Sequence, residues 1–259
     1  KYLPSKFCPY INEVCFRMAY FCQDCYFLLI KSVIQYMPFI VDRQFVIGTF
    51  DELDLTSYYV DAAILYAHTY KSDIFQLIRI FTKKIDGESS HSLRFLAEIS
   101  FLAEFPLINY WDMAFDCLNK SEELHIASIP ALTCIIQRFK PHEQREKLFS
   151  LLYSIHGDNS KLKLAFLNSI DNSLLHHFVS PDLFFILQEL YLDEDIEVSK
   201  AVLSLITRIA RISPLSTLTF FHKKLDQFQD LFYQIPKKTE QKLLLKSLPF
   251  LISASGDIV

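Results

Sequence analysis

The chain has 259 residues and a net charge of −4, and 51 % of its residues are hydrophobic. This apolar fraction can bury a large core. A slightly acidic chain lacks the basic surface that neutralises phosphates, which argues against a nucleic-acid-binding protein. The sequence holds four glycines, so turn-rich β architectures are disfavoured and the glycine-rich loops that bind nucleotide phosphates are excluded.

The N-terminal region, residues 1–56, is rich in aromatic and apolar side chains. We expect two helices in its first fifty residues, with breaks at Pro38-Phe39 and at the acidic stretch 51–54. The pattern does not define their limits. We therefore expect this region to supply the first helices of a larger helical array.

The most apolar part of the chain, residues 14–41, is interrupted by charged side chains that include Arg17, Asp24 and Lys31. A charge at the centre of a membrane-spanning helix costs about 2.5 to 3.5 kcal/mol. We interpret this part as buried helices and expect no membrane insertion. The chain begins at Lys1 without a methionine or a signal-peptide pattern, so we expect it to be a segment of a longer polypeptide.

Helical periodicity is clear from residue 57 onward, and four prolines that are 35, 40 and 33 residues apart each open a helical stretch. Such spacing is typical of repeated helix pairs, which are about 33 to 47 residues long. The prolines are Pro106, Pro141, Pro181 and Pro214. The pattern predicts helices over 57–70, 72–85, 91–104, 107–118, 121–139, 142–155, 160–170, 181–190, 196–212, 215–233 and 239–254.

The stretch 180–214 shows the predicted helix pair most plainly. Ser180 is expected to accept a hydrogen bond from the free amides of the first turn, Pro181 suits the first helical position, and Asp182 complements the positive helix start. An acidic turn, 193–195, separates the two helices. Apolar residues then recur at steps of three and four in both helices: Leu183, Ile186, Leu187, Leu190, Val198, Ala201, Val202, Leu205, Ile206, Ile209 and Ala210.

An acidic residue before the second helix and a valine a few positions later, as in Asp193, Asp195 and Val198, resemble HEAT repeats. The fold expected is all-α, an α-solenoid of antiparallel helix pairs of the HEAT or armadillo type. The expected domains are N-terminal helices over 1–56, HEAT-like helices over 57–105, and about four helix pairs over 106–259. These pairs are 106–140, 141–180, 181–213 and 214–259.

The run 167–225 resembles, in an unbroken register, the N-terminal HEAT array of the target of rapamycin (TOR) kinase family. That family's Leu-x-Ser-Leu-Asp motif is matched by residues 167–171, and its His-Leu pair by His177-Phe178. Its Gly-Arg-Leu and Asn-Pro fall on Thr207-Arg208-Ile209 and Ser213-Pro214. The chain departs from the family at three positions. It has Ser199 where the family has an arginine, Thr207 where the family has the glycine of Gly-Arg-Leu, and Ser213 where the family has the asparagine of Asn-Pro.

The resemblance implies a non-catalytic scaffold segment of a large serine/threonine protein kinase whose catalytic domain lies outside this chain. It implies contact with a Raptor-like subunit and with a second copy in a dimeric complex, and a cytoplasmic location, peripheral to an endomembrane through partners. No residue is assigned a catalytic, cofactor-binding or metal-binding role, and no cofactor or small-molecule substrate is expected. This segment is not expected to be an enzyme.

Six cysteines occur, and Cys22 and Cys25 form a C-x-x-C pair. A structural zinc site needs further ligands, and no second pair supplies them. A thioredoxin-type redox pair needs a preceding strand and a helix N-terminus at the cysteines, and the sequence shows neither. Cys8, Cys15 and Cys22 are seven residues apart, and we interpret them as small apolar core residues with reduced thiols.

Other polar or aromatic residues favour structural roles. Adjacent residues such as His176-His177 point in different directions on a helix, so a helix-end or surface position is expected rather than a metal site. Glu98 and Glu104 are expected to be solvated carboxylates. Trp111 is interpreted as packing between helices rather than as a binding hot spot.

A second reading starts from Ser92-Leu93-Arg94-Phe95-Leu96-Ala97-Glu98, which resembles a helix of MIF4G-like domains. It implies an interaction module of an RNA-processing or translation assembly. Such modules present a basic groove to RNA, which the net charge of −4 does not favour. Both readings describe a helical binding module, and they differ in the partner.

Overall fold

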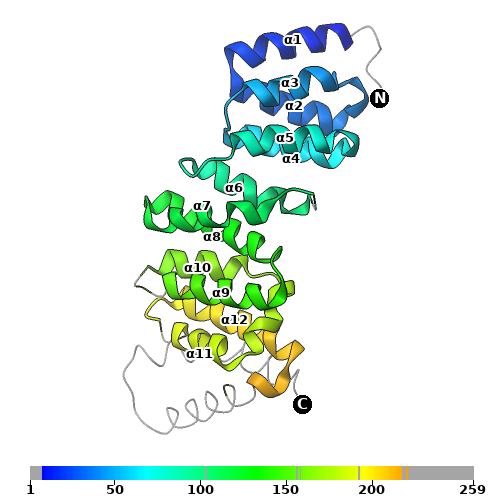
Figure 1. Cartoon of the computed structure of the whole chain (residues 1–259). Coiled ribbons are helices and arrows are strands. Elements are labelled where there is room, and N and C mark those ends of the chain that lie inside the picture. The colour runs from blue at the N-terminus through cyan, green and yellow to red at the C-terminus, as the bar shows by residue number, and fades with distance from the viewer. Residues whose placement is uncertain are drawn as a thin grey trace. The chain divides into compact units, whose positions relative to one another are not determined.

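The computed structural model describes residues 8–102, 104–155, 157, 159–191, 193–217 and 220. These described residues form helices and connecting turns, without a strand (Figure 1). The chain divides into two compact units, unit 1 (Lys1–Cys134) and unit 2 (Ile135–Val259). The predicted helices 215–233 and 239–254 lie almost wholly outside the described residues.

Unit 1 is built from α-helices joined by short 3₁₀ turns. The α-helices are α1 (Cys8–Phe21), α2 (Gln23–Tyr36), α3 (Arg43–Glu52), α4 (Ser57–Thr69), α5 (Ile74–Lys84), α6 (Ser90–Glu98), α7 (Trp111–Asp116) and α8 (Glu122–Ile136), the last of which crosses the unit boundary. The 3₁₀ turns are Pro38–Ile40, Lys71–Asp73, Ile99–Phe101, Leu107–Tyr110 and Cys117–Asn119.

Unit 2 contains α9 (Pro141–Ile155), α10 (Ser160–Ser169), the 3₁₀ helix Asn172–Val179, α11 (Pro181–Leu190) and α12 (Ile196–Ile212). Both predicted limits of α11 and α12 are confirmed. Asp195 caps α12 by accepting a hydrogen bond from the Glu197 amide at 2.9 Å. The predicted cap at α11 is wrong, because the Ser180 hydroxyl makes no cap hydrogen bond and is buried without a protein partner.

Three other predictions are corrected by the structure. The described part of the N-terminal region, from residue 8 on, has three α-helices instead of two, because the chain also breaks at Cys22, between α1 and α2. The predicted helix 91–104 ends at Glu98, since Leu102 and Phe105 are both buried, 3 % exposed, in the connection that follows. The predicted helix 107–118 is α-helical only within α7, and its first turn is a 3₁₀ turn closed by the Asn109 amide on the Pro106 carbonyl.

The core of unit 1 forms because alternate helices pack together: α2 against α4, α4 against α6, and α3 against α5. Aromatic rings fill this core, with Phe27 and Phe50 5.1 and 5.2 Å from the Tyr59 ring. The tyrosine hydroxyls in this core have hydrogen-bond partners. The Tyr59 hydroxyl donates to the Phe50 carbonyl at 2.8 Å, and the Tyr26 hydroxyl lies 2.6 Å from the Thr49 hydroxyl. Fully buried tyrosines therefore leave no unpaired hydroxyl here.

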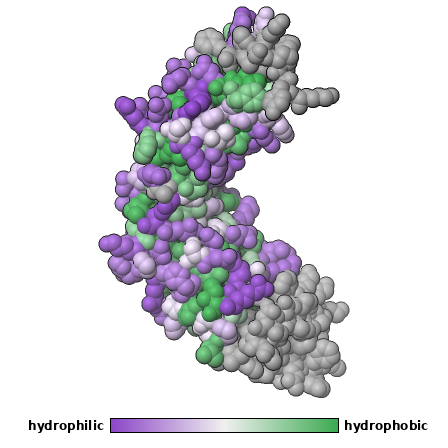
Figure 2. Space-filling view, turned by 90° about the vertical axis from the view of Figure 1, so that its right-hand side faces the viewer, coloured by the Kyte–Doolittle hydropathy of each residue, from purple (hydrophilic) through white to green (hydrophobic). Residues whose placement is uncertain are grey.

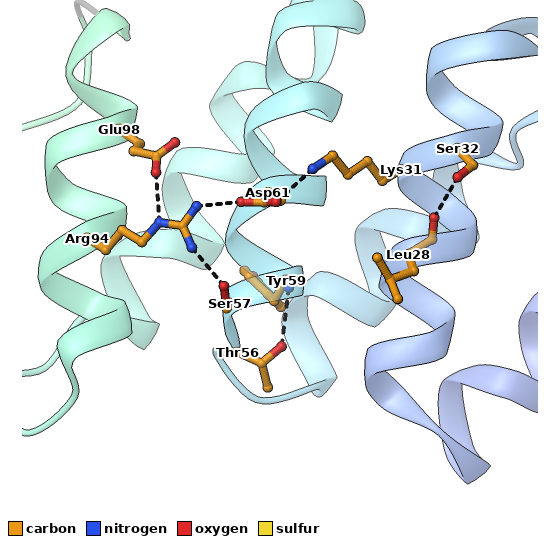
Figure 3. A network of polar contacts seen from close by, with 9 residues as sticks. All are labelled: Leu28, Lys31, Ser32, Thr56, Ser57, Tyr59, Asp61, Arg94 and Glu98. Carbon is orange, nitrogen blue, oxygen red and sulfur yellow. Dashed lines mark hydrogen bonds and ion pairs between the residues drawn. The ribbon is translucent and has the colours of Figure 1, made fainter.

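A polar network joins α2, α4 and α6 (Figure 3). Asp61 on α4 accepts from Lys31 Nζ at 2.7 Å and from Arg94 Nη2 at 2.6 Å. Arg94 also donates to Glu98 at 2.8 Å and to Ser57 at 2.7 Å. Although partial burial raises the pKa of Asp61, the two cations hold it below its ordinary value. One carboxylate thus connects three alternate helices, α2, α4 and α6.

In unit 2, α12 packs against α10 and α11. Lys163 on α10 and Asp193 in the turn before α12 form an ion pair with a 2.5 Å separation, and their side chains are 9 % and 10 % exposed. Arg208 on α12 donates to the Ile170 carbonyl at 2.9 Å. Polar contacts therefore tie α12 to the helices before it at both of its ends.

Among the described residues, none of the helices combines the length and apolar character that a membrane crossing requires.

Candidate functional site

Helix α9 carries two apolar faces, and only one of them is buried. Its buried stripe consists of Leu148, Leu151, Leu152 and Ile155. Phe149 and Tyr153, one turn apart, lie outside that stripe and are 44 % and 76 % exposed. Large aromatic side chains on the solvent side of a helix are candidates for binding rather than for the core.

Helix α11 also exposes an aromatic side chain. Phe185 is 59 % exposed, whereas Leu183 and Leu187 on the other side of this helix are fully buried. Asp182 and Glu189 lie three residues before and four residues after Phe185, so they share its face. The N-terminal Pro181 fixes where this face begins.

Two adjoining hollows, here called the α9/α11 groove, lie between these helices. One has a volume of about 650 Å³ and the other of about 640 Å³, and both are lined by Phe149 and Asp182. The second is walled by Tyr153, Phe185 and Ile186 and is mostly apolar. Figure 2 shows that hydrophobic surface emerges between hydrophilic areas on the face it displays, so exposed apolar side chains are not confined to the ends of the described chain.

The groove is acidic overall. The described residues that line it include one arginine, Arg145, and three carboxylates, those of Glu146, Asp182 and Glu189. Arg145 Nη2 lies 2.6 Å from Asp182 Oδ2, and this exposed pair joins α9 to α11. Since this pair neutralises itself, the Glu146 carboxylate beside it favours a ligand that carries positive charge.

A buried polar contact supports one end of the groove. His177 is 7 % exposed and its Nε2 lies 2.7 Å from Gln144 Oε1. The Gln144 amide nitrogen in turn donates to the carbonyls of Gln137 and Phe139. Burial, followed by the nearby His176 and Arg145, lowers the pKa of His177 to about 4. The imidazole is therefore neutral at pH 7 and serves as a fixed hydrogen-bonding group.

Of the residues weighed as candidate sites from the sequence, His177 lines this groove. Pro141, Pro181, Asp182 and Ile186, which the sequence marked only as helix signals or core positions, line it as well. His176 is exposed beside it at the end of a 3₁₀ helix, so the predicted helix-end position holds, but His177 itself is buried. Trp111 is buried, 6 % exposed, which fits a packing role rather than an exposed hot spot. Its ring stacks on Phe115 of the same helix, α7, with centroids 5.4 Å apart, so this contact does not test the predicted packing between helices. Glu98 and Glu104 are exposed, as predicted.

The cysteine predictions are only partly right. Cys15 is a buried core residue as predicted, but Cys22 and Cys25 are exposed. Cys22 directly precedes α2 as its N-cap, so the helix start that the sequence did not reveal is present at the C-x-x-C pair. No group of three histidine, cysteine or carboxylate side chains that could hold a metal ion occurs in the part of the chain that the structure describes.

Sequence reasoning missed Phe149, Tyr153 and Phe185. The available signal was a second apolar stripe on helices that already had a complete buried stripe, at positions 149 and 153 on α9 and 185 on α11. Periodicity alone does not say which of two stripes faces the core. Packing in three dimensions decides it.

A scan against protein-family models and a search of curated proteins found no match for this chain. The function is therefore argued from the geometry of the helices and of the groove.

Proposed function

We propose that this chain is a non-catalytic helical-repeat scaffold segment that binds protein partners, with the α9/α11 groove as a binding surface. The observation that carries the proposal is the exposure of Phe149, Tyr153 and Phe185 around two adjoining hollows. Exposed aromatic side chains beside a concave surface are typical of the few residues that dominate protein binding.

The repeat architecture proposed here is a HEAT-like α-solenoid. Its support comes from the sequence separation of polar contacts between helices. Lys31 and Asp61 are 30 residues apart, Asp61 and Arg94 are 33 apart, and Lys163 and Asp193 are 30 apart. A contact that recurs at about the length of one helix pair joins equivalent helices of neighbouring repeats. Packing of α2 on α4 and of α4 on α6 follows the same rule.

The groove suits an amphipathic helix or extended segment with large apolar anchors and flanking lysines or arginines. The anchors would lie against Phe149, Tyr153 and Phe185, which give contact area at a low cost in side-chain entropy. The basic side chains would meet the carboxylate of Glu146 at the groove rim. Charge at the rim sets the partner's orientation and association rate more than its affinity.

The larger assembly that we propose is a TOR-like kinase complex in the cytoplasm, with a Raptor-like subunit as partner. The proposal rests on the register of residues 167–225 described above. The RNA-assembly alternative draws less support, because Arg94 of the MIF4G-like stretch is engaged with Asp61, Glu98 and Ser57 inside unit 1. An arginine held in this way is not presented to phosphates.

The test is an affinity purification of the protein from its own cells, with mass spectrometry of what co-elutes. Wild type is compared with Tyr153→Ser/Phe185→Ser and with the control Phe75→Ser on α5. Tyr153 and Phe75 are both 76 % exposed, so the control removes one aromatic side chain outside the groove that matches Tyr153 in fractional exposure. A partner that binds the groove is retained by wild type and control and lost from the double variant. Its dissociation constant should rise roughly 30-fold for each 2 kcal/mol of binding free energy removed.

Recovery of a Raptor-like subunit and a small β-propeller protein would support the kinase assembly. Recovery of RNA-processing or translation factors would replace it with the alternative. If every partner is recovered equally with the double variant, the groove is not the binding surface.

A further inference from the structure

The start of α2 carries two exposed thiols. Cys22 occupies the N-cap position and Cys25 the third helical position of this 14-residue helix. Both side chains are exposed. The N-cap and third positions are those whose side chains face each other in a capping box. Here cysteines take both places.

The spacing suits a disulfide. Residues three apart at a helix start have Cα atoms about 5 Å apart, inside the range of about 4.4 to 6.8 Å that disulfides use. The two thiols lie close enough to interact, and a hydrogen bond with Cys22, followed by desolvation and nearby negative charge, raises the pKa of Cys25. The positive end of the helix acts in the opposite direction, because it favours negative charge on a sulfur placed there.

Packing holds this helix start in place. Gln23, between the N-cap and the first turn, donates to the Asp54 carbonyl at 2.8 Å. Directly after Cys25, Tyr26 and Phe27 are fully buried in the aromatic core. The two cysteines are therefore exposed to solvent on a first turn that packing holds in place.

We propose that Cys22 and Cys25 form a reversible thiol–disulfide exchange site whose reaction partner is a disulfide, of the class of oxidised glutathione. A thiolate of the pair attacks one sulfur of the glutathione disulfide, forming a mixed disulfide and releasing one glutathione. The second cysteine attacks the mixed disulfide through its own thiolate, forming the Cys22–Cys25 bond and releasing the second glutathione. The pair loses two protons and two electrons, and the oxidant becomes two thiols.

Two other cysteines, Cys15 and Cys117, lie in settings unsuited to this chemistry. Cys15 is 3 % exposed and burial raises its pKa to about 11. Cys117 is fully buried, and burial raises its pKa as well. Thiol reactivity follows access and thiolate character, so these two residues are built-in controls.

The test treats the whole folded chain with mixtures of reduced and oxidised glutathione, then blocks free thiols and digests with trypsin. Cleavage after Arg17 and Lys31 gives the peptide 18–31, in which Cys22 and Cys25 are the only cysteines. In wild type we expect this peptide to lose two hydrogen atoms and escape blocking, and to return to two blocked thiols after dithiothreitol. Cys22→Ser and Cys25→Ser should each carry one glutathione instead. Cys117 should stay unmodified, which shows that the protein remained folded.

Two results would overturn the proposal. One is a wild-type peptide 18–31 whose thiols remain fully open to blocking in oxidised glutathione. The other is a wild-type peptide that accumulates glutathione on either cysteine without losing the two hydrogens, because the second thiol then fails to reach the first. Neither result bears on the α9/α11 groove.

Discussion

Removal of one partner from the buried ion pair of unit 2 should strongly destabilise the protein. Lys163 Nζ and the Asp193 carboxylate are 2.5 Å apart, with side chains 9 % and 10 % exposed. Lys163→Met keeps a similar side-chain length but leaves Asp193 charged and buried. Breaking a buried pair in this way costs roughly 3 to 5 kcal/mol. Because a tenth of each side chain still reaches water, we expect the lower end, about 3 kcal/mol.

Urea denaturation followed by helical circular dichroism measures this cost. The set comprises wild type, Lys163→Met, Asp193→Asn and the double variant, and asparagine keeps an acceptor for the Asp195 amide that Asp193 binds at 2.9 Å. The double variant should be more stable than the sum of the single effects predicts, with a coupling of about 1 to 3 kcal/mol. A cost below about 1 kcal/mol for Lys163→Met, with no coupling, would mean that the pair behaves as a solvated surface pair and the reasoning fails.

The same pair has a pH signature. Burial raises the pKa of Asp193, but hydrogen bonds from Lys163 and from the Asp195 amide hold it below its ordinary value. Folding therefore favours the ionised carboxylate. The stabilisation is present above the unfolded pKa of about 3.9 and is lost as pH falls through the lower folded value. The stability gap between wild type and Lys163→Met should accordingly narrow below about pH 4, and a gap that widens there would contradict this assignment.

Three further predictions concern single residues. The pKa of His177 in the folded protein is about 4, below the usual 6.5, so folding favours the neutral imidazole. Thermal stability should therefore decline as pH falls from 6.5 toward 4. His177→Gln should flatten that decline, and an unchanged profile would exclude His177 as its source. Leu187→Ala, at a fully buried site, should cost about 2 to 5 kcal/mol in urea denaturation, and a loss below about 1 kcal/mol would show that α11 packs loosely. Asp61→Asn leaves Lys31 and Arg94 without their carboxylate but at a partly exposed site, so about 1 kcal/mol is expected, and a cost as large as that of Lys163→Met would contradict the ranking by burial.

The α-helices α9 to α12 of unit 2 could be predicted because local signals and packing agree there, whereas the 3₁₀ helix Asn172–Val179 was not predicted. The limits of α11 and α12 follow from Pro181 at the first helical position and Asp195 as N-cap, with uninterrupted apolar stripes between them. Where such signals are weak, the prediction failed. The break at Cys22 was missed because cysteine is a rare N-cap, and its side chain makes no cap hydrogen bond.

The groove could not be predicted because it depends on contacts between separate helices. Periodicity places Phe149 and Tyr153 on one side of α9, but only the packing of the leucine stripe shows that this side faces solvent. The pairing of Arg145 with Asp182 joins residues 37 apart and has no local signature. The buried setting of His177 arises in the same way, from Gln144 on a different helix.

The turn between α11 and α12 explains why position 199 holds a small polar residue, Ser199. Ser199 is 2 % exposed, and its hydroxyl donates to the Tyr191 carbonyl at 2.9 Å and contacts the Asp193 carbonyl at 3.3 Å. These carbonyls belong to the chain leaving α11, where backbone acceptors lack helical partners. A short hydroxyl satisfies them inside the fold, whereas a longer cationic side chain at this position would have to leave the buried site. The turn therefore requires a small donor at position 199, and its acidic residue, Asp193, takes its cation from Lys163 on α10 instead.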